Sequence, residues 1–154
     1  MLDTIVRFAQ PSDRVHLSRL REDLWPDYSV EHHSRELSLL LEGEAFLTMP
    51  FVIVVAQATD GNLVGFIEVG LRSHADGCDP SRPVGFIEGW YVAEHCRHKG
   101  IGRKLLIAAE AWARTEGVTE MASDTPVDNE VSQRVHQALG YTVVERCVHY
   151  RKPL

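Results

Sequence analysis

The chain has 154 residues and a net charge of −6, with 44% hydrophobic and 25% charged residues, which fits one soluble domain over residues 1–154 with a complete core. Because Lys and Arg form no basic run, the acidic chain is a poor nucleic-acid binder. No apolar run approaches the about 20 residues of a membrane span, and no basic-then-apolar signal segment opens the chain, so we expect a cytoplasmic protein with no membrane partner.

Turn and helix-start residues divide the first half of the chain. Pro11-Ser12-Asp13 is a helix-start signal, and Ser29 can cap a second helix. Asp60-Gly61-Asn62 predicts a hairpin turn between two apolar, β-branched segments. The expected elements are a strand over 4–8, helices over 11–25 and 29–43, and strands over 51–58 and 63–71.

The second half combines a loop with two helices. Residues 72–83 hold Gly, Pro, Asp and Ser and predict a loop. Leu105, Ala109 and Trp112 recur at helical spacing before Gly117, which ends the helix. The expected elements are strand 84–93, helix 101–116, strand 121–123, helix 129–139 and strand 141–150. This order predicts an α+β fold with a mixed sheet rather than a doubly wound nucleotide-binding fold.

Cysteine and histidine spacing predicts neither a disulfide framework nor a metal site. Cys78, Cys96 and Cys147 form no C-x-x-C pair. The eight histidines show no ligand pattern, and the adjacent His32 and His33 cannot share one helix face.

The segment R-H-K-G-I-G, residues 97–102, lies between a predicted strand and a predicted helix. Its glycines let a ligand approach the main chain, and the following helix N-terminus presents unpaired N–H groups. With Arg97, Lys99 and Arg103 beside it, the segment fits a pyrophosphate cradle. It lacks the Gly-Lys-Ser/Thr of a P-loop, and Leu105 stands where a dinucleotide fingerprint has its third glycine. The alternative is a basic loop that only turns the chain.

R-x-x-G-x-G between a long strand and an amphipathic helix resembles the acetyl-CoA-binding motif of the GCN5-related N-acetyltransferases (GNAT), and the order of elements is similar over nearly the whole chain. The resemblance implies a bent, mostly antiparallel central sheet, flanked by helices, whose splayed strands hold the pantetheine arm of acetyl-CoA. It implies that the backbone of Trp90, Tyr91 and Val92 contacts the pantetheine and that the Asn129 side chain also contacts the cofactor. The backbone contacts to the pyrophosphate come from His98, Lys99, Gly100, Ile101, Gly102 and Arg103.

Five further segments resemble the bacterial aminoglycoside 6′-N-acetyltransferases, which confer resistance by acetylating one amine of the drug. They are Leu24-Trp25-Pro26, Phe86-Ile87-Glu88-Gly89, Met121-Ala122-Ser123-Asp124-Thr125, Val135-His136-Gln137-Ala138-Leu139-Gly140 and His149-Tyr150-Arg151-Lys152. The resemblance implies direct transfer from acetyl-CoA to the 6′-amine of a cationic aminoglycoside. It also suggests a homodimer, in which the last strand could pair between chains, although that strand could equally lie in the middle of the sheet.

Glu88, on the strand before the motif, and Asp124, which ends the next strand, are the principal candidate carboxylates, because adjacent strand ends can face one cleft. The resemblance assigns both to the drug amines, leaves open a base role for either, and adds Glu145 as a further substrate carboxylate. Each has a structural alternative: an ion pair for Glu88, a turn for Asp124 and a solvated strand face for Glu145.

The resemblance also assigns Trp25 and Tyr28 to a lip that packs on the sugar rings, and Tyr150 to protonation of the departing CoA thiolate. The alternatives are helix-end packing for Trp25 and terminal packing for Tyr150. In the loop over 73–83, where relatives can place an aromatic substrate contact, this chain offers only His74 and Ala75.

Two other functions are open at this stage. The same domain could acetylate another amine, such as a polyamine or a protein N-terminus. It could instead bind acetyl-CoA as a non-catalytic sensor, although such a protein would not need Glu88 and Asp124.

Overall fold

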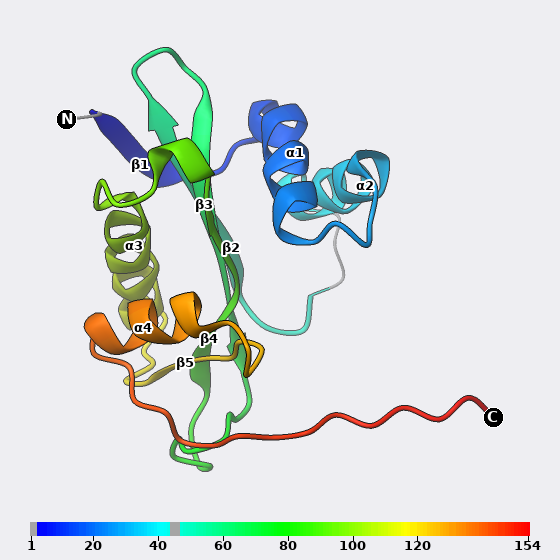
Figure 1. The fold of residues 1–154 in the computed structure, drawn as a ribbon, viewed down its shortest axis with the longest axis vertical. Coiled ribbons are helices and arrows are strands. Elements are labelled where there is room, and N and C mark those ends of the chain that lie inside the picture. The colour runs from blue at the N-terminus through cyan, green and yellow to red at the C-terminus, as the bar shows by residue number, and fades with distance from the viewer. Residues whose placement is uncertain (1–2, 44–46) are drawn as a thin grey trace.

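The computed structural model describes residues 3–43 and 47–154 (Figure 1). Its strands are β1 (Thr4–Phe8), β2 (Phe51–Ala58), β3 (Leu63–Arg72), β4 (Val84–Val92) and β5 (Met121–Ser123). Its helices are α1 (Arg14–Leu24), α2 (Val30–Leu41), α3 (Ile101–Thr115) and α4 (Glu130–Ala138), with 3-10 turns at Pro11–Asp13 and Glu94–Cys96. Within these residues no helix combines the length and apolarity that crossing a membrane requires.

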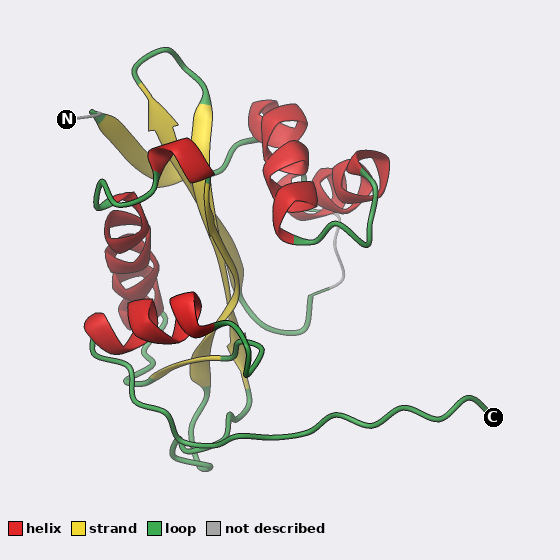
Figure 2. Ribbon diagram, in the orientation of Figure 1, coloured by secondary structure: helices red, strands yellow, loops and turns green. Residues whose placement is uncertain are grey.

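The strands form one sheet in the order β1-β2-β3-β4-β5. Neighbours from β1 to β4 run antiparallel, whereas β5 runs parallel to β4. Figures 1 and 2 show α1 and α2 on one face of the sheet and α3 on the other. The predicted α+β fold with a mixed, mostly antiparallel sheet is therefore confirmed.

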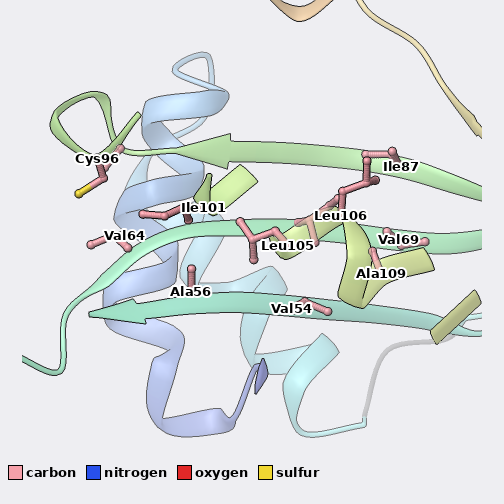
Figure 3. Close-up of a cluster of buried hydrophobic side chains, with 12 residues drawn as sticks. Val54, Ala56, Val64, Val69, Ile87, Cys96, Ile101, Leu105, Leu106 and Ala109 are labelled. Carbon is pink, nitrogen blue, oxygen red and sulfur yellow. The ribbon is translucent and has the colours of Figure 1, made fainter. Parts of the chain in front are cut away.

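Two hydrophobic clusters, one on each face, hold the helices to the sheet. Val55 and Leu17 belong to the cluster under α1 and α2. Val54 and Leu105 belong to the cluster under α3 (Figure 3). Because successive residues of β2 face opposite clusters, that strand reads in the sequence as an uninterrupted apolar run. Leu105 is fully buried, and truncating such a leucine to alanine costs about 2–5 kcal/mol.

The sheet changes at Glu88 in two ways. In the pairing of β3 with β4, Glu68 stands opposite Gly89 and Val69 opposite Ile87, so Glu88 is the extra residue of a β-bulge. The pairing of β4 with β5 also ends there, since Ile87 opposite Ser123 is its last pair. Beyond this point β4 continues without β5, in keeping with the splayed strands that the resemblance implied.

The predicted strand over 141–150 is wrong for the single chain. This segment contains no strand, and Figure 1 shows it running away from the sheet to the C-terminus. Val143, Val144 and Val148 are 55%, 61% and 73% exposed. The valines give the segment strand propensity, but a strand also needs a neighbour for its backbone hydrogen bonds, and the described residues of this chain supply none.

Candidate active site

The second half of β4 offers an open edge. Residues 89–92 pair with β3 on one side, whereas on the β5 side no described strand pairs with them. Trp90, Tyr91 and Val92, the residues expected to contact the pantetheine, all lie on this stretch. An extended ligand with amide groups can add to such an edge as a strand would.

The turn before α3 is shaped for an anion. Gly100 is the N-cap with φ 77°, in the left-handed region, and no side chain caps the helix. His98 has φ 60°, which for a residue other than glycine stores roughly 1–3 kcal/mol of strain and is common at binding sites. The first-turn amides of α3 therefore remain available, together with the positive end of the helix dipole.

The cationic side chains of this turn differ in how they are held. Arg97 Nε donates to the Val92 carbonyl at 2.9 Å, and its guanidinium lies 5.7 Å from the Tyr91 ring centre. Lys99 Nζ donates to the His95 carbonyl at 2.9 Å. Arg103 lies exposed on the first turn of α3. Arg97 thus links the anion-binding turn to the open edge of β4.

Trp90 packs where the open edge meets α3. Its ring lies against Gly102, where an added Cβ would stand 3.4 Å from the indole. Its Nε1 is buried and has no hydrogen-bond partner among the described residues. A buried N–H donor without a partner normally signals an acceptor that belongs there. This atom, the uncapped helix and the open edge together fit a coenzyme A thioester.

His136 of α4, to which the sequence alone assigned no role, contacts both β5 and the part of β4 that lies beyond the β5 pairing. Its Nε2 lies 2.9 Å from Ser123 Oγ and its Nδ1 lies 2.8 Å from the Ser132 carbonyl. The carbonyl only accepts, so Nδ1 donates to it, and in a neutral ring Nε2 then accepts from the serine hydroxyl. The ring stands edge-on to Trp90 and Tyr141. Asn129, expected to touch the cofactor, caps α4 by accepting from the Ser132 amide at 3.1 Å.

Glu88 and Asp124 lie where the pairing of β4 with β5 ends. Each directly follows a member of the last β4–β5 pair, Ile87 and Ser123, and each is exposed. The Glu88 carboxylate accepts two hydrogen bonds from Arg72, at 2.9 Å from Nε and 2.7 Å from Nη2. Sequence reasoning missed Arg72, because only the strand register places it near Glu88.

Trp25 packs against Gly89 of the bulge, on the face of the sheet that α1 and α2 cover. A Cβ on Gly89 would overlap the Trp25 indole, so glycine is required for this close approach. Tyr28, three residues on, is 54% exposed and stacks on His32 with ring centres 4.6 Å apart. Of the two expected lip residues, Trp25 therefore contacts the residue next to Glu88, whereas Tyr28 contacts His32.

The tail residues are not at this site in the single chain. Glu145 is exposed and Tyr150 is 92% exposed, and both lie in the extended segment after α4 (Figure 1). Their expected roles stay predictions.

A strand edge that opens beside an uncapped helix N-terminus, with an acidic rim, is the geometry of a transferase that takes an acyl group from a nucleotide-tailed thioester. A family model described as the acetyltransferase (GNAT) family matches residues 17–141. The chain belongs to this family. Both the fold and the family membership expected from R-x-x-G-x-G are confirmed.

Within this family, the chain is similar to proteins and solved structures that are named as aminoglycoside acetyltransferases. Aminoglycoside N(6′)-acetyltransferase type 1 of Klebsiella aerogenes is 39% identical over 97% of both chains. The protein of the same name from Stenotrophomonas maltophilia is 41% identical over 97% of this chain and 93% of its own. The structure of AAC(6′)-Iy in complex with CoA matches with a TM-score of 0.86 and 34% identity over 100% of this chain and 97% of that one. AAC(6′)-Iy in complex with the bisubstrate analogue CoA-S-monomethyl-acetylneamine matches with a TM-score of 0.83 and 33% identity over 99% of both chains.

Proposed function

We propose that this protein transfers the acetyl group of acetyl-CoA to the 6′-amine of aminoglycosides and thereby confers resistance to them. The observation that carries the proposal is the coincidence of the open edge of β4, the uncapped N-terminus of α3 and two carboxylates at one point of the sheet. The relatives named for this activity match this chain over most of their own length. A cytoplasmic single domain suits a drug that acts inside the cell.

The residues that bind acetyl-CoA position its thioester for attack. Acetyl-CoA supplies an activated acetyl group. The nitrogen of the neutral amine bonds to the acetyl carbon and gives up one proton through water, while the carbon–sulfur bond breaks and the CoA sulfur leaves as a thiolate that takes up a proton. Backbone groups of Trp90 and Val92 align the pantetheine and donate to the developing oxyanion. The amides around Gly100 and Gly102 hold the pyrophosphate, with Arg97 and Arg103 beside them. Holding both reactants in place can contribute about 7–11 kcal/mol of the rate enhancement, more than a single base.

The acceptor side binds a polycation. Glu88 and Asp124 hold drug ammonium groups, and Trp25 and Tyr28 pack on the sugar rings. An incoming ammonium competes with Arg72 for Glu88, so acceptor binding replaces one ion pair with another. Several acids together are effective, because an ion pair at 4 Å is worth about 1 kcal/mol in water and about 4 at an effective dielectric of 20.

Two molecules act together in this proposal, joined through the tail. The short strand β5 pairs with one described neighbour only, so its other edge can accept a strand. The tail exposes Val143, Val144 and Val148, and exchange of such a segment between copies is a common route to dimers. In the dimer Glu145 and Tyr150 of one copy reach the acceptor site of the other, where Tyr150 protonates the thiolate.

Light scattering on the full chain tests the dimer. We expect twice the chain mass of 17.3 kDa for the wild type and for Val127→Asp, a control whose 66% exposed valine lies outside the tail. Val148→Asp should give the single-chain mass. A monomeric wild type at assay concentration would remove the dimer.

The activity itself is tested by CoA release, followed with a thiol reagent, from acetyl-CoA and two matched drugs. Kanamycin carries an amine at the 6′ position and paromomycin a hydroxyl. Turnover with kanamycin alone is expected. Acetyl-CoA binding without turnover of either drug would contradict the proposal and favour another acceptor or a sensor.

A further inference from the structure

Arg21 and Glu68 form a buried charged pair that the proposed chemistry does not use. Arg21 is 6% exposed and Glu68 is 3% exposed. Arg21 Nε lies 3.0 Å from Glu68 Oε1, and Arg21 Nη1 lies 3.1 Å from Glu36 Oε2. The atoms are close, but they are not aligned as hydrogen bonds. Such a pair loses several kcal/mol per ion on leaving water, so hydrophobic side chains would serve stability as well.

The position of the pair is more informative than its strength. Glu68 stands opposite Gly89 in the register, beside the bulge that carries Glu88. Arg21 comes from α1, on the face that also holds Trp25. The pair therefore lies directly beneath the place where the acceptor side of the site begins.

Arg21 touches Trp25 in two ways. Its guanidinium carbon lies 5.2 Å from the centre of the Trp25 ring, within the range of a cation–π contact. Its carbonyl accepts the Trp25 amide at 2.7 Å, which closes the end of α1. The Cζ2 and Cη2 atoms of the Trp25 ring meet Gly89. Trp25 thus contacts both Arg21 and the bulge.

The charges around Arg21 keep it in this place. Arg21 pairs with Glu36 of α2 and Glu68 of β3. Burial raises the pKa of Glu68 to about 7, with Arg21 opposing the rise and Glu36 and Glu88 adding to it. Glu36 is half-exposed, whereas Glu68 is enclosed. Glu68 is therefore the partner that can fix the guanidinium from within.

We infer that Arg21, anchored by Glu68, is a positioning residue that sets the Trp25 indole against the bulge and so determines how tightly the acceptor is held. The inference rests on the proposed function, because it assigns Trp25 to the acceptor lip. Lysine at position 21 would keep the charge but lose the planar group that faces the ring.

The first test separates acceptor binding from the rest of catalysis. Arg21→Lys and Glu68→Gln should each raise the KM for kanamycin by about tenfold, within the range of a desolvated cation–π contact. The kcat and the KM for acetyl-CoA should stay within about twofold. In a Trp25→Leu background neither change should raise the kanamycin KM further, because both act through that ring.

Arg7→Lys is the matched control, since Arg7 forms a similar pair with the buried Asp13 at 2.7 Å on β1. It should leave the kanamycin KM unchanged. Equal losses for both substrates in Arg21→Lys and Glu68→Gln, or additive effects with Trp25→Leu, would overturn the inference.

A second readout does not depend on the drug. With 5-fluorotryptophan in place of its three tryptophans, fluorine NMR gives a Trp25 resonance that Trp25→Phe identifies. Arg21→Lys should shift or broaden that resonance and leave Trp112 unchanged. An unchanged Trp25 resonance overturns the positioning role even if kanamycin is acetylated. A shifted resonance without wild-type turnover supports the positioning role and rejects the drug as acceptor.

Discussion

Glu88 and Arg72 form a two-point ion pair at the mouth of the proposed acceptor site, with donor distances of 2.9 and 2.7 Å. The guanidinium of Arg72 also lies 3.4 Å from the centre of the Phe86 ring. The Glu88 carboxylate is therefore already bound to a cationic side chain. Its role is better described as binding an ammonium group than as removing a proton from it.

Removing Glu88 should weaken drug binding, whereas removing Arg72 should strengthen it. Glu88→Gln removes the carboxylate and should raise the kanamycin Kd by about tenfold. Arg72→Gln removes the competing cation and should lower the Kd by about two- to fivefold, in keeping with a partly exposed pair. Calorimetry measures both. Weaker binding by both variants would show that Arg72 supports the drug rather than competing with it.

Asp124 should matter for the drug and not for the cosubstrate. Asp124→Asn removes a charge at the split of β4 and β5 and should weaken kanamycin binding more than acetyl-CoA binding. Asp128→Asn, an exposed acid just before α4, serves as the control and should change neither. Equal losses of both ligands in Asp124→Asn, measured by calorimetry, would count against the assignment.

The glycine at the start of α3 has a matched partner elsewhere in the chain. Gly100 and Gly140 both have positive φ, 77° and 94°, and an added Cβ would meet no atom within 4 Å of either. Alanine at either position should lower stability by about 1 kcal/mol, because that backbone region disfavours a Cβ. Only Gly100→Ala should also raise the KM for acetyl-CoA. A similar KM rise in Gly140→Ala would mean that strain alone explains the effect.

The Glu68 carboxyl should make stability depend on pH. Its folded-state pKa of about 7 lies above its ordinary value of 4.5, so the folded chain holds this proton more tightly than the unfolded chain. The stabilisation is complete below pH 4.5 and is lost as pH rises through 7, by on the order of 3 kcal/mol at most. Denaturant unfolding at pH 5 and pH 8 should show this loss in the wild type and much less of it in Glu68→Gln. Equal losses in both proteins would contradict the assignment.

The sequence located most elements because their signals are local. The strand over 51–58 is a β-branched run between turn residues, and Ser29 accepts from the His32 amide as a capping residue should. The glycines of 97–102 marked the anion-binding turn in the same way. The last strand failed because strand propensity was present in the tail, whereas the described residues of this chain supply no strand to pair with it.

The pairs that shape the site could not be found in this way. Arg72 meets Glu88, and Arg21 meets Glu68, only because of the register of β3 with β4 and the packing of α1 on the sheet. His136 was visible as part of a resembling segment, but its contact with Ser123 depends on where α4 lies. Each of these contacts is a tertiary relationship between residues far apart in the chain.

Amide hydrogen exchange, measured with and without acetyl-CoA, tests most directly whether the open edge of β4 and the start of α3 form one cosubstrate site. Acetyl-CoA should slow exchange at residues 90–92 and at residues 100–103 together, with no matching change in α2. Protection of α3 alone, or of neither segment under conditions where acetyl-CoA is bound, would contradict the placement of the cosubstrate along β4.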